Sequence, residues 1–155
     1  MSDICYIGNI DLLKQQKVAF LSSRNISPQS VMACYDWATQ QRSAGRCVIS
    51  GFHSKIEKDV LHFLLKGKQP VILVLARSLY KQLPEEFIKP LEENRLLIVS
   101  VVSQRTKRQS IETALLRNKY IVENANEIVF GSLDPNGMLY QLFTESKSLN
   151  KHTIL

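Results

Sequence analysis

Short apolar runs alternate with helical patterns along the chain, and this alternation constrains the fold more than any other feature of the sequence. Six runs rich in β-branched and other apolar residues have the length and composition of buried parallel strands. They are Lys17–Ser22, Arg46–Ser50, Pro70–Ala76, Arg95–Val102, Glu127–Gly131 and His152–Leu155. Helical patterns fill the intervals between them. The sequence therefore predicts an α/β fold with a doubly wound, mostly parallel Rossmann-like sheet and helices on both faces.

Local signals set the limits of the predicted helices. Ser27 is a suitable N-cap, Pro28 suits a first helical position, and Gly45 is a natural C-terminal stop. The other predicted helices are Ile56–Leu65, Pro84–Asn94 with a break near Pro90, Ser110–Glu123 and Gly137–Ser146. No repeat, low-complexity tract or linker interrupts the pattern, so residues 1–155 are predicted to form one domain.

Composition excludes several classes of protein. Hydrophobic residues make up 45% of the chain and charged residues 22%, which is typical of a globular protein and not of a disordered one. No apolar run approaches the roughly 18 to 20 residues of a membrane helix, and the N-terminus does not resemble an export signal. The three cysteines, Cys5, Cys34 and Cys47, form no CxxC pair. They indicate reduced thiols in a cytoplasmic protein without a metal site.

The loops that follow the predicted strands are the expected place of function. In open α/β sheets, ligands bind outside the carboxyl ends of the strands, where the strand order switches. Most of these loops carry serine, and several add arginine or lysine, as in Ser22-Ser23-Arg24. Hydroxyl donors, guanidinium groups and helix N-termini all suit a phosphate. There is no GxGxxG and no P-loop, so we expect no dinucleotide or other cofactor.

The positive charge of the chain is clustered. The formal net charge is +6, and residues 101–120 hold five basic residues against a single acid, Glu112. The five are Arg105, Lys107, Arg108, Arg117 and Lys119. Clustered charge of this kind favours a nucleic-acid partner. Arg24 is interpreted as an anion ligand in preference to a solvated loop residue.

Enzymatic activity has weaker support in the sequence. His53 fits a loop hydrogen-bonding residue better than a general base, because no partner carboxylate or nucleophile is placed beside it. No other dyad is evident, so we predict binding without catalysis.

Several motifs occur in one order and together carry a family resemblance. Gly8-Asn9 with Leu12-Leu13, and then Ser22-Ser23-Arg24 with Ser27-Pro28 after an apolar strand, resemble the entry to the Rossmann domain of the DNA-processing protein A (DprA/Smf) family. Four later motifs are similar to those of the same family: Ser50-Gly51 with Ile56, Leu75-Ala76-Arg77-Ser78-Leu79 with Pro84, Arg117-Asn118-Lys119-Tyr120-Ile121, and Gly131-Ser132-Leu133. The resemblance covers residues 6 to 155.

This resemblance implies non-catalytic binding of single-stranded DNA in a basic pocket, in DNA uptake or recombination. It also implies a homodimer and a recombinase partner. Its motifs implicate Ser23, Arg24, Ser50, Gly51, Arg117, Asn118 and Lys119, to which the charge cluster adds Arg105, Lys107 and Arg108. If the pocket is kept, Arg24 and Arg117 face one phosphate, and Ser23 and Ser50 donate hydroxyl hydrogen bonds to it.

The sequence also departs from the family, and alternatives stay open. Ser22, Ala76 and Ser78 replace family glycines, so we expect an altered pocket, and the flanking modules of the family have no counterpart. A sensor or carrier of a small phosphorylated nucleotide is the second interpretation, and a nucleotide hydrolase is the third. Competition by a mononucleotide separates the first two, and turnover would favour the third.

Overall fold

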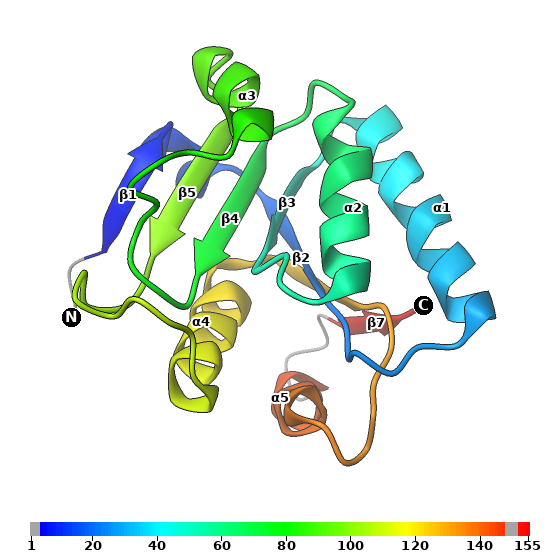
Figure 1. Ribbon diagram of the computed structural model, residues 1–155. Coiled ribbons are helices and arrows are strands. Elements are labelled where there is room, and N and C mark those ends of the chain that lie inside the picture. Colours follow the sequence, from blue (N-terminus) through cyan, green and yellow to red (C-terminus); the bar gives the residue numbers. More distant parts are fainter. Residues whose placement is uncertain (1–3, 148–151) are drawn as a thin grey trace.

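A seven-stranded sheet forms the centre of the molecule (Figure 1), in the order β1-β5-β4-β3-β2-β6-β7. The computed structural model describes residues 4–147 and 152–155. The strands are β1 (Cys5–Gly8), β2 (Lys17–Leu21), β3 (Cys47–Ser50), β4 (Val71–Leu75), β5 (Leu96–Ser100), β6 (Glu127–Phe130) and β7 (His152–Ile154). β1 pairs antiparallel with β5, and every other pairing is parallel. The predicted fold class is confirmed.

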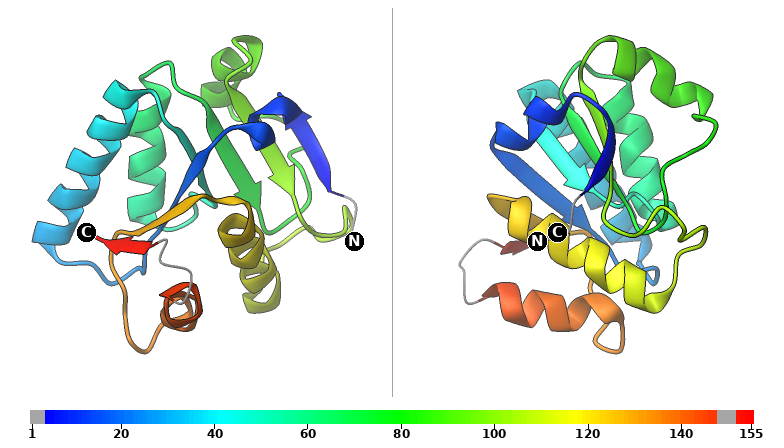
Figure 2. Two further views of the ribbon diagram at one scale, coloured as in Figure 1. Left: turned by 180° about the vertical axis from the view of Figure 1, so that it is seen from behind. Right: turned by 90° about the vertical axis from the view of Figure 1, so that its left-hand side faces the viewer.

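Helices cover both faces of this sheet (Figure 2). They are η1 (Ile10–Lys14), α1 (Pro28–Ala44), α2 (Lys55–Leu65), η2 (Glu85–Phe87), α3 (Ile88–Glu92), α4 (Ile111–Asn124) and α5 (Met138–Lys147). α1 and α2 pack in the core of one face, whereas α4 and α5 pack in the core of the other. None of the helices within the described residues is both long and apolar enough to span a membrane.

The central strands are buried on both faces, which explains their continuous apolar sequence. Along β2, Val18 and Phe20 belong to the core beneath α1 and α2, while Ala19 and Leu21 belong to the core beneath α4 and α5. All four side chains are at most 1% exposed. Burial of this kind on both faces fixes the register of the sheet, and with it the positions of the loops at its carboxyl edge.

The predicted start and end of α1 are confirmed. Ser27 caps the helix by accepting a hydrogen bond from the backbone N–H of Ser30 at 3.2 Å. Gly45 ends it in the left-handed conformation, with φ of 71°. That conformation is the one that glycine adopts without steric cost, so the chain turns here directly into β3.

Several elements differ from the sequence prediction, and the short helix η1 is one that was not predicted. Strand β1 was not predicted, because it is only four residues long and lies at the sheet edge, with alternating half-buried and exposed positions. The predicted break near Pro90 lies instead between η2 and α3. Pro90 is the third residue of α3, where the helix does not yet need its N–H as a donor.

The strand order reverses beside β2. The chain moves from β2 through β3 and β4 to β5 on one side, and then returns to the other side of β2 as β6 and β7. The carboxyl ends of β2 and β6 therefore flank the topological switch point of the sheet, the place where such folds bind ligands.

Candidate nucleic-acid interface

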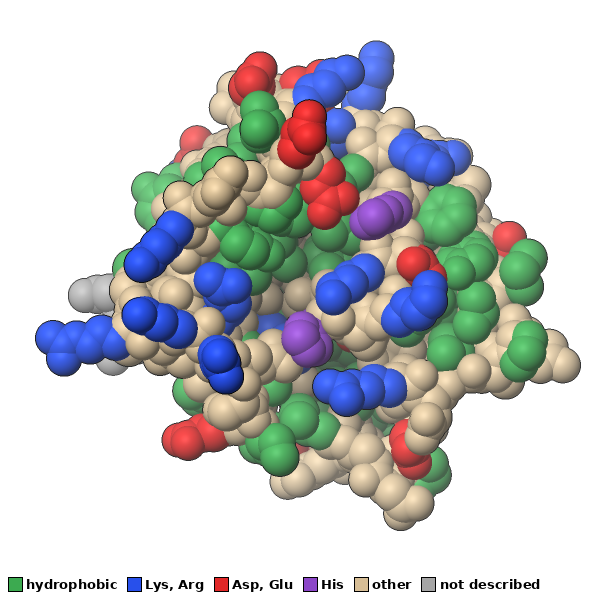
Figure 3. Space-filling model, in the orientation of Figure 1, with side chains coloured by type: hydrophobic (Ala, Val, Ile, Leu, Met, Phe, Trp, Pro, Cys, Tyr) green, Lys and Arg blue, Asp and Glu red, His purple; other side chains and the backbone are tan. Residues whose placement is uncertain are grey.

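Two cavities lie side by side at the carboxyl edge of the sheet. The first, of about 350 Å³, is lined by residues that follow β2 and β6 and by α4; we call it the switch-point cavity. The second, of about 440 Å³, lies at the ends of β3 and β4 and is lined by Tyr80 and Phe87; we call it the aromatic cavity. His53, Gln109 and Arg117 line both. Figure 3 shows Lys and Arg side chains gathered around a hollow across this face.

Hydrogen bonds join the two loops that flank the switch point. The N–H of Ser23 donates to the carbonyl oxygen of Ser132, and the N–H of Asp134 donates to Oγ of Ser23, both at 2.9 Å. Asn25 adds a bond from Nδ2 to the Asp134 carboxylate and accepts one from the Ser132 hydroxyl, both at 3.0 Å. These four contacts hold the loops after β2 and β6 as one unit. The Ser23 hydroxyl accepts from Asp134 and can still donate its own proton to a ligand.

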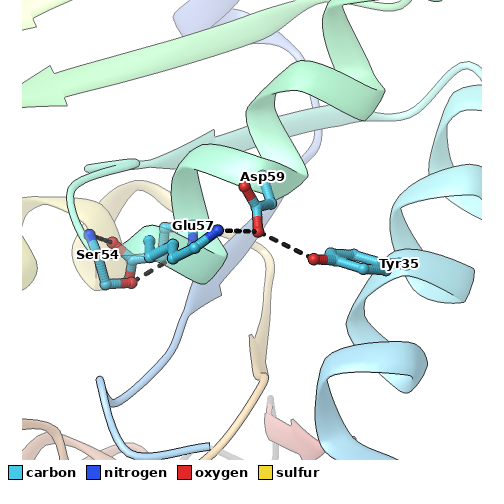
Figure 4. A network of polar contacts seen from close by, with 5 residues as sticks. Tyr35, Ser54, Glu57 and Asp59 are labelled. Carbon is cyan, nitrogen blue, oxygen red and sulfur yellow. Dashed lines mark hydrogen bonds and ion pairs between the residues drawn. The ribbon is translucent and has the colours of Figure 1, made fainter. Parts of the chain in front are cut away.

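Glu57 joins a third loop to this unit. Its carboxylate accepts hydrogen bonds from the N–H groups of His53 and Ser54 at 2.9 and 3.2 Å, and from that of Ser22 at 3.0 Å. Ser54 returns the contact by accepting from the Glu57 N–H, which completes a capping box at the start of α2 (Figure 4). The side chain is 5% exposed. A single buried carboxylate therefore positions the loops after both β2 and β3.

The helix that carries Glu57 is itself anchored. Figure 4 shows Tyr35 of α1 pointing at Asp59 of α2, with a hydrogen bond of 2.9 Å between the phenol and the carboxylate. The two helices also pack through the tilted rings of Tyr35 and Phe63, whose centroids are 5.0 Å apart. Helix α2, which carries Glu57, is thus held against α1 by both a hydrogen bond and ring packing.

Arg117 is the buried cation between the two cavities. Its side chain is 7% exposed and donates from Nη1 to Gln109 at 2.8 Å and from Nε to Asn118 at 3.1 Å. Burial lowers the pKa of its guanidinium, and nearby Glu57 opposes this effect. An arginine keeps its charge in such a setting, so a fixed cation faces both cavities.

Gly51 makes room for that cation. A Cβ at Gly51 would lie 2.7 Å from Nε and 2.8 Å from Cδ of Arg117, closer than packing allows. The glycine of the Ser50-Gly51 motif is therefore explained by the close approach of the Arg117 side chain to the backbone of the loop.

Ser50 supports the loop from below. It is fully buried and lines neither cavity, and its Oγ accepts the N–H of Phe52 at 3.1 Å. Phe52 has φ of 45°, a conformation that a bulky side chain rarely adopts. Because Ser50 is fully buried and lines neither cavity, its hydroxyl is not placed to donate the expected hydrogen bond to a phosphate there, and it stabilises the strained turn at Phe52.

Exposed cations surround the buried one. Arg24 lines the switch-point cavity and, within the part of the chain that the structure describes, has no hydrogen bond or ion pair of its side chain. The pKa of His53 is lowered by burial and by the charges of Arg117, Lys58 and Arg24, in that order. His53, which lines both cavities, therefore lies within the electrostatic influence of three cations.

The structure divides the predicted site residues into three groups. Ser23, Arg24, Arg117 and Asn118 line the switch-point cavity. Gly51, Lys107 and Arg108 line the aromatic cavity, together with Arg117. Ser50, Arg105 and Lys119 line neither. Arg24 and Arg117 both line the switch-point cavity, although 93 positions (117 − 24) separate them in the sequence.

Two supporting residues were not predicted. Glu57 is not among the predicted site residues, although the pattern Ser54-x-x-Glu57 is a recognisable capping box. Gln109 has no such signal, because it lies in a loop and acts through its bond to Arg117. Among the described residues, no group of three or more His, Cys, Asp or Glu is placed to hold a metal ion.

Comparisons with known proteins identify a matching family and solved structures of similar fold. Residues 2–131 match the family described as DNA recombination-mediator protein A. The fold is similar to that of DNA processing protein A from Helicobacter pylori, a structure that describes its single-stranded DNA binding mode, with 17% identity and a TM-score of 0.78. That match covers 97% of this chain and 70% of the other. No curated protein sequence matches the chain.

Two further solved structures share the fold. DNA processing protein A from Streptococcus pneumoniae is 19% identical with a TM-score of 0.74, over 97% of this chain and 53% of that one. The chain therefore spans about half the length of that relative. The Moco carrier protein from Chlamydomonas reinhardtii is 12% identical with a TM-score of 0.56, over 91% of this chain and 76% of that one. At these identities the likeness establishes the fold alone.

Proposed function

The chain belongs to the DNA recombination-mediator protein A family, and from this premise we propose that it binds single-stranded DNA without converting it. The observation that carries the proposal is the meeting of Arg24 and Arg117 at one cavity on the topological switch point. One guanidinium is buried and held by neighbours, and the other is exposed and without a protein partner among the described residues. A phosphate between them would accept hydrogen bonds from both guanidinium groups.

The surroundings of the cavity support a polyanion over a single small anion. Lys58, Lys107 and Arg108 line the adjoining aromatic cavity, so positive charge continues beyond the first phosphate. A chain of phosphates gains from each such cation through the release of counterions. Glu57 and Asp134 line the switch-point cavity and Glu86 lines the aromatic cavity, but Figure 3 shows several other acids together near α3, at the top of this face.

The arrangement of Glu57, the one buried carboxylate among the described residues, supports binding without catalysis. A general base needs a free lone pair directed at the substrate. The Glu57 carboxylate already accepts three backbone N–H groups. Its role is to position loops, and the pKa of His53 beside it is lowered by burial and then by the charges of neighbouring cations.

A small phosphorylated nucleotide is the second candidate ligand. The switch-point cavity of about 350 Å³ lies within the range of small-molecule sites. The likeness to a Moco carrier protein shows that the fold also occurs in a carrier of a small cofactor. Excess mononucleotide displaces a labelled strand only if this second candidate is correct.

We also expect a homodimer and a recombinase partner, in line with the family. Three large apolar side chains are exposed on α4, namely Ile111, Leu115 and Leu116, each at least half exposed. An apolar helix face of this kind is suited to burial against another protein. This expectation is separate from DNA binding, because the three side chains line neither cavity.

Anisotropy titration of a labelled oligothymidylate tests the proposed function. Wild type should bind more weakly as salt rises, and Arg24→Ala should weaken binding about tenfold at low salt, the size of one charge-assisted contact. The melting temperature should stay unchanged, because Arg24 is exposed and its side chain has no hydrogen-bond or ion-pair partner among residues 4–147 and 152–155.

Lys119→Ala is the matched control. Lys119 is an exposed cation that lines neither cavity, so its loss should leave the affinity nearly unchanged. Absence of binding at low salt, or equal effects of the two substitutions, would contradict the proposal.

A further inference from the structure

Helix α4 has one face that is buried in the molecule and an opposite face that is exposed. Its buried residues are Ala114, Arg117, Asn118 and Ile121. Its exposed residues are Ile111, Glu112, Leu115, Leu116, Lys119 and Glu123. At about 3.6 residues per turn, the exposed residues project on the side away from the sheet. This face is therefore free to contact another molecule.

The middle of the exposed face of α4 is apolar. Leu115 is 50% exposed and Leu116 is 51% exposed, and Ile111, one turn earlier, is 74% exposed. Exposed apolar side chains that gather on one helix face indicate a contact with another protein. The three side chains line neither cavity, so a strand bound there does not account for them.

Two charges are arranged symmetrically about the leucines. Glu112 lies three residues before Leu115, and Lys119 lies three residues after Leu116, so both are equally far from the midpoint of the two leucines. Within one helix these charges are two turns apart, about 10 Å, which is too far for an ion pair. The side chains of Glu112 and Lys119 also have no ion pair or hydrogen bond elsewhere in the part of the chain that the structure describes.

A face of this kind is complementary to a second copy of itself. When two identical helices pack antiparallel about a twofold axis, residues equally far from the axis on opposite sides face each other. An axis between Leu115 and Leu116 packs the leucines of both copies together. It also places Glu112 of each copy opposite Lys119 of the other, which gives two intermolecular ion pairs. An unrelated partner would not require this internal symmetry, whereas a second copy does.

From this pattern we infer that α4 is a homodimer interface, in which a second copy of the chain packs its own α4 antiparallel about an axis between Leu115 and Leu116. The inference deepens the homodimer of the proposed function, on which it rests, by assigning the surface and the register. One pair of helices forms a small interface, so we expect weak and reversible association. Arg117 lies on the buried side of the same helix, so the switch-point cavity of each copy stays outside the interface.

Sedimentation velocity over a range of protein concentrations tests for this dimer. Wild type should shift from a mass of 17.7 kDa toward twice that value as the concentration rises. Leu115→Gln should stay monomeric at the concentrations at which wild type associates. Met32→Gln is the matched control and should associate as wild type does, because Met32 is 58% exposed on α1, over the other face of the sheet. Both substituted residues are at least half exposed, so both variants should keep the fold.

Charge reversal tests the register of the two helices. Glu112→Lys or Lys119→Glu alone places like charges opposite each other at two positions of the dimer, and should weaken association about fivefold. The two reversals combined should restore the wild-type association, because both ion pairs form again with their partners exchanged. Since Glu112 and Lys119 do not contact each other within one copy, this coupling reports the intermolecular pair.

Disulfide cross-linking tests the orientation of the two helices. In the antiparallel pair the two Leu115 positions lie beside each other, whereas the two Glu123 positions are about 22 Å apart along the helix axes. The test uses a Cys5→Ser background, in which the remaining native cysteines are buried. Leu115→Cys should form a covalent dimer on mild oxidation, and Glu123→Cys should not.

The possible outcomes separate this interface from strand binding. A wild type that stays monomeric, a dimer that survives Leu115→Gln, or a double reversal that associates no better than the single ones would overturn the α4 interface. Cross-linking through Glu123→Cys would overturn it as well. Strand binding is measured at concentrations at which wild type is monomeric, and Leu115→Gln should leave it unchanged. Loss of strand binding with the dimer intact would instead overturn the proposed function.

Discussion

The switch-point cavity and the aromatic cavity share a wall but hold their charges differently. In the first, Glu57 and Arg117 are only 5% and 7% exposed, and each is held by hydrogen bonds to its neighbours. In the second, the cations Lys58, Lys107 and Arg108 are all exposed. Buried charges are costly to desolvate and tolerate little change, whereas exposed ones are screened by salt and easily replaced. The two cavities should therefore respond to mutation in different ways.

The largest effect is expected at Glu57. Glu57→Ala removes the acceptor of three backbone N–H groups and leaves the buried charge of Arg117 without its nearby carboxylate. We expect a loss of about 3 kcal/mol in the free energy of unfolding, measured by urea denaturation. Binding should also weaken, because the loops after β2 and β3 lose their common anchor.

An acid of the aromatic cavity gives the contrast. Glu86 lines that cavity, and its exposed carboxylate lies 3.4 Å from Nε2 of His62. Glu86→Ala should change the free energy of unfolding by less than about 1 kcal/mol, as for other surface ion pairs. Equal losses in the free energy of unfolding from Glu57→Ala and Glu86→Ala would contradict the distinction between a cavity with buried charges and one with exposed charges that salt screens.

Two exposed cations of the aromatic cavity, Lys107 and Arg108, should determine how steeply the affinity for a single strand falls with salt. Each phosphate neutralised on a single strand contributes a slope of about −0.7 to the plot of log affinity against log salt. Replacing both Lys107 and Arg108 by alanine should therefore make the slope shallower by about 1.4. The difference in affinity from wild type should be largest at low salt and vanish at high salt.

A neighbouring loop cation provides the control for this slope. Arg105 belongs to the same basic loop but lines neither cavity. Arg105→Ala should leave the slope close to that of wild type. A slope that falls equally for Arg105→Ala would show that the whole loop attracts the strand without specific phosphate contacts.

The same contrast explains which parts of the site are visible in the sequence. The fold follows from the alternation of apolar strands and helical patterns, because burial on both faces forces a continuous apolar sequence. The convergence of Arg24 and Arg117 follows as well, since both belong to elements at one edge of a parallel sheet. The exposed cations of the site can also be predicted, because they cluster along the sequence.

Supporting contacts are less visible, because they depend on tertiary geometry. Nothing in the local sequence indicates that the Glu57 carboxylate also accepts the N–H of Ser22, 35 positions away. Ser50 looks like a ligand-binding serine in a motif, but the strained turn at Phe52 uses its hydroxyl. The strand β1 was missed for a related reason, since an edge strand lacks the continuous apolar run of a central one.

The smallest predicted effect is the pH dependence of binding, carried by His53 on the wall between the cavities. Burial and the charges of Arg117, Lys58 and Arg24 lower its pKa from the ordinary value of 6.5. In the free protein the neutral ring is thus favoured, so His53 should make stability fall slightly as the pH drops below 6.5, where the unfolded chain takes up the proton more readily.

A phosphate bound between these cations should offset their field, so the pKa of His53 should be higher in the complex than in the free protein. Binding therefore takes up a fraction of a proton, and affinity should rise about two- to threefold as the pH falls from about 8 to about 6. His53→Gln should flatten this profile, whereas His62→Gln should leave it in place, because His62 does not line the switch-point cavity. A profile unchanged by His53→Gln would assign the proton uptake to another group and remove His53 from the wall that senses the bound phosphate.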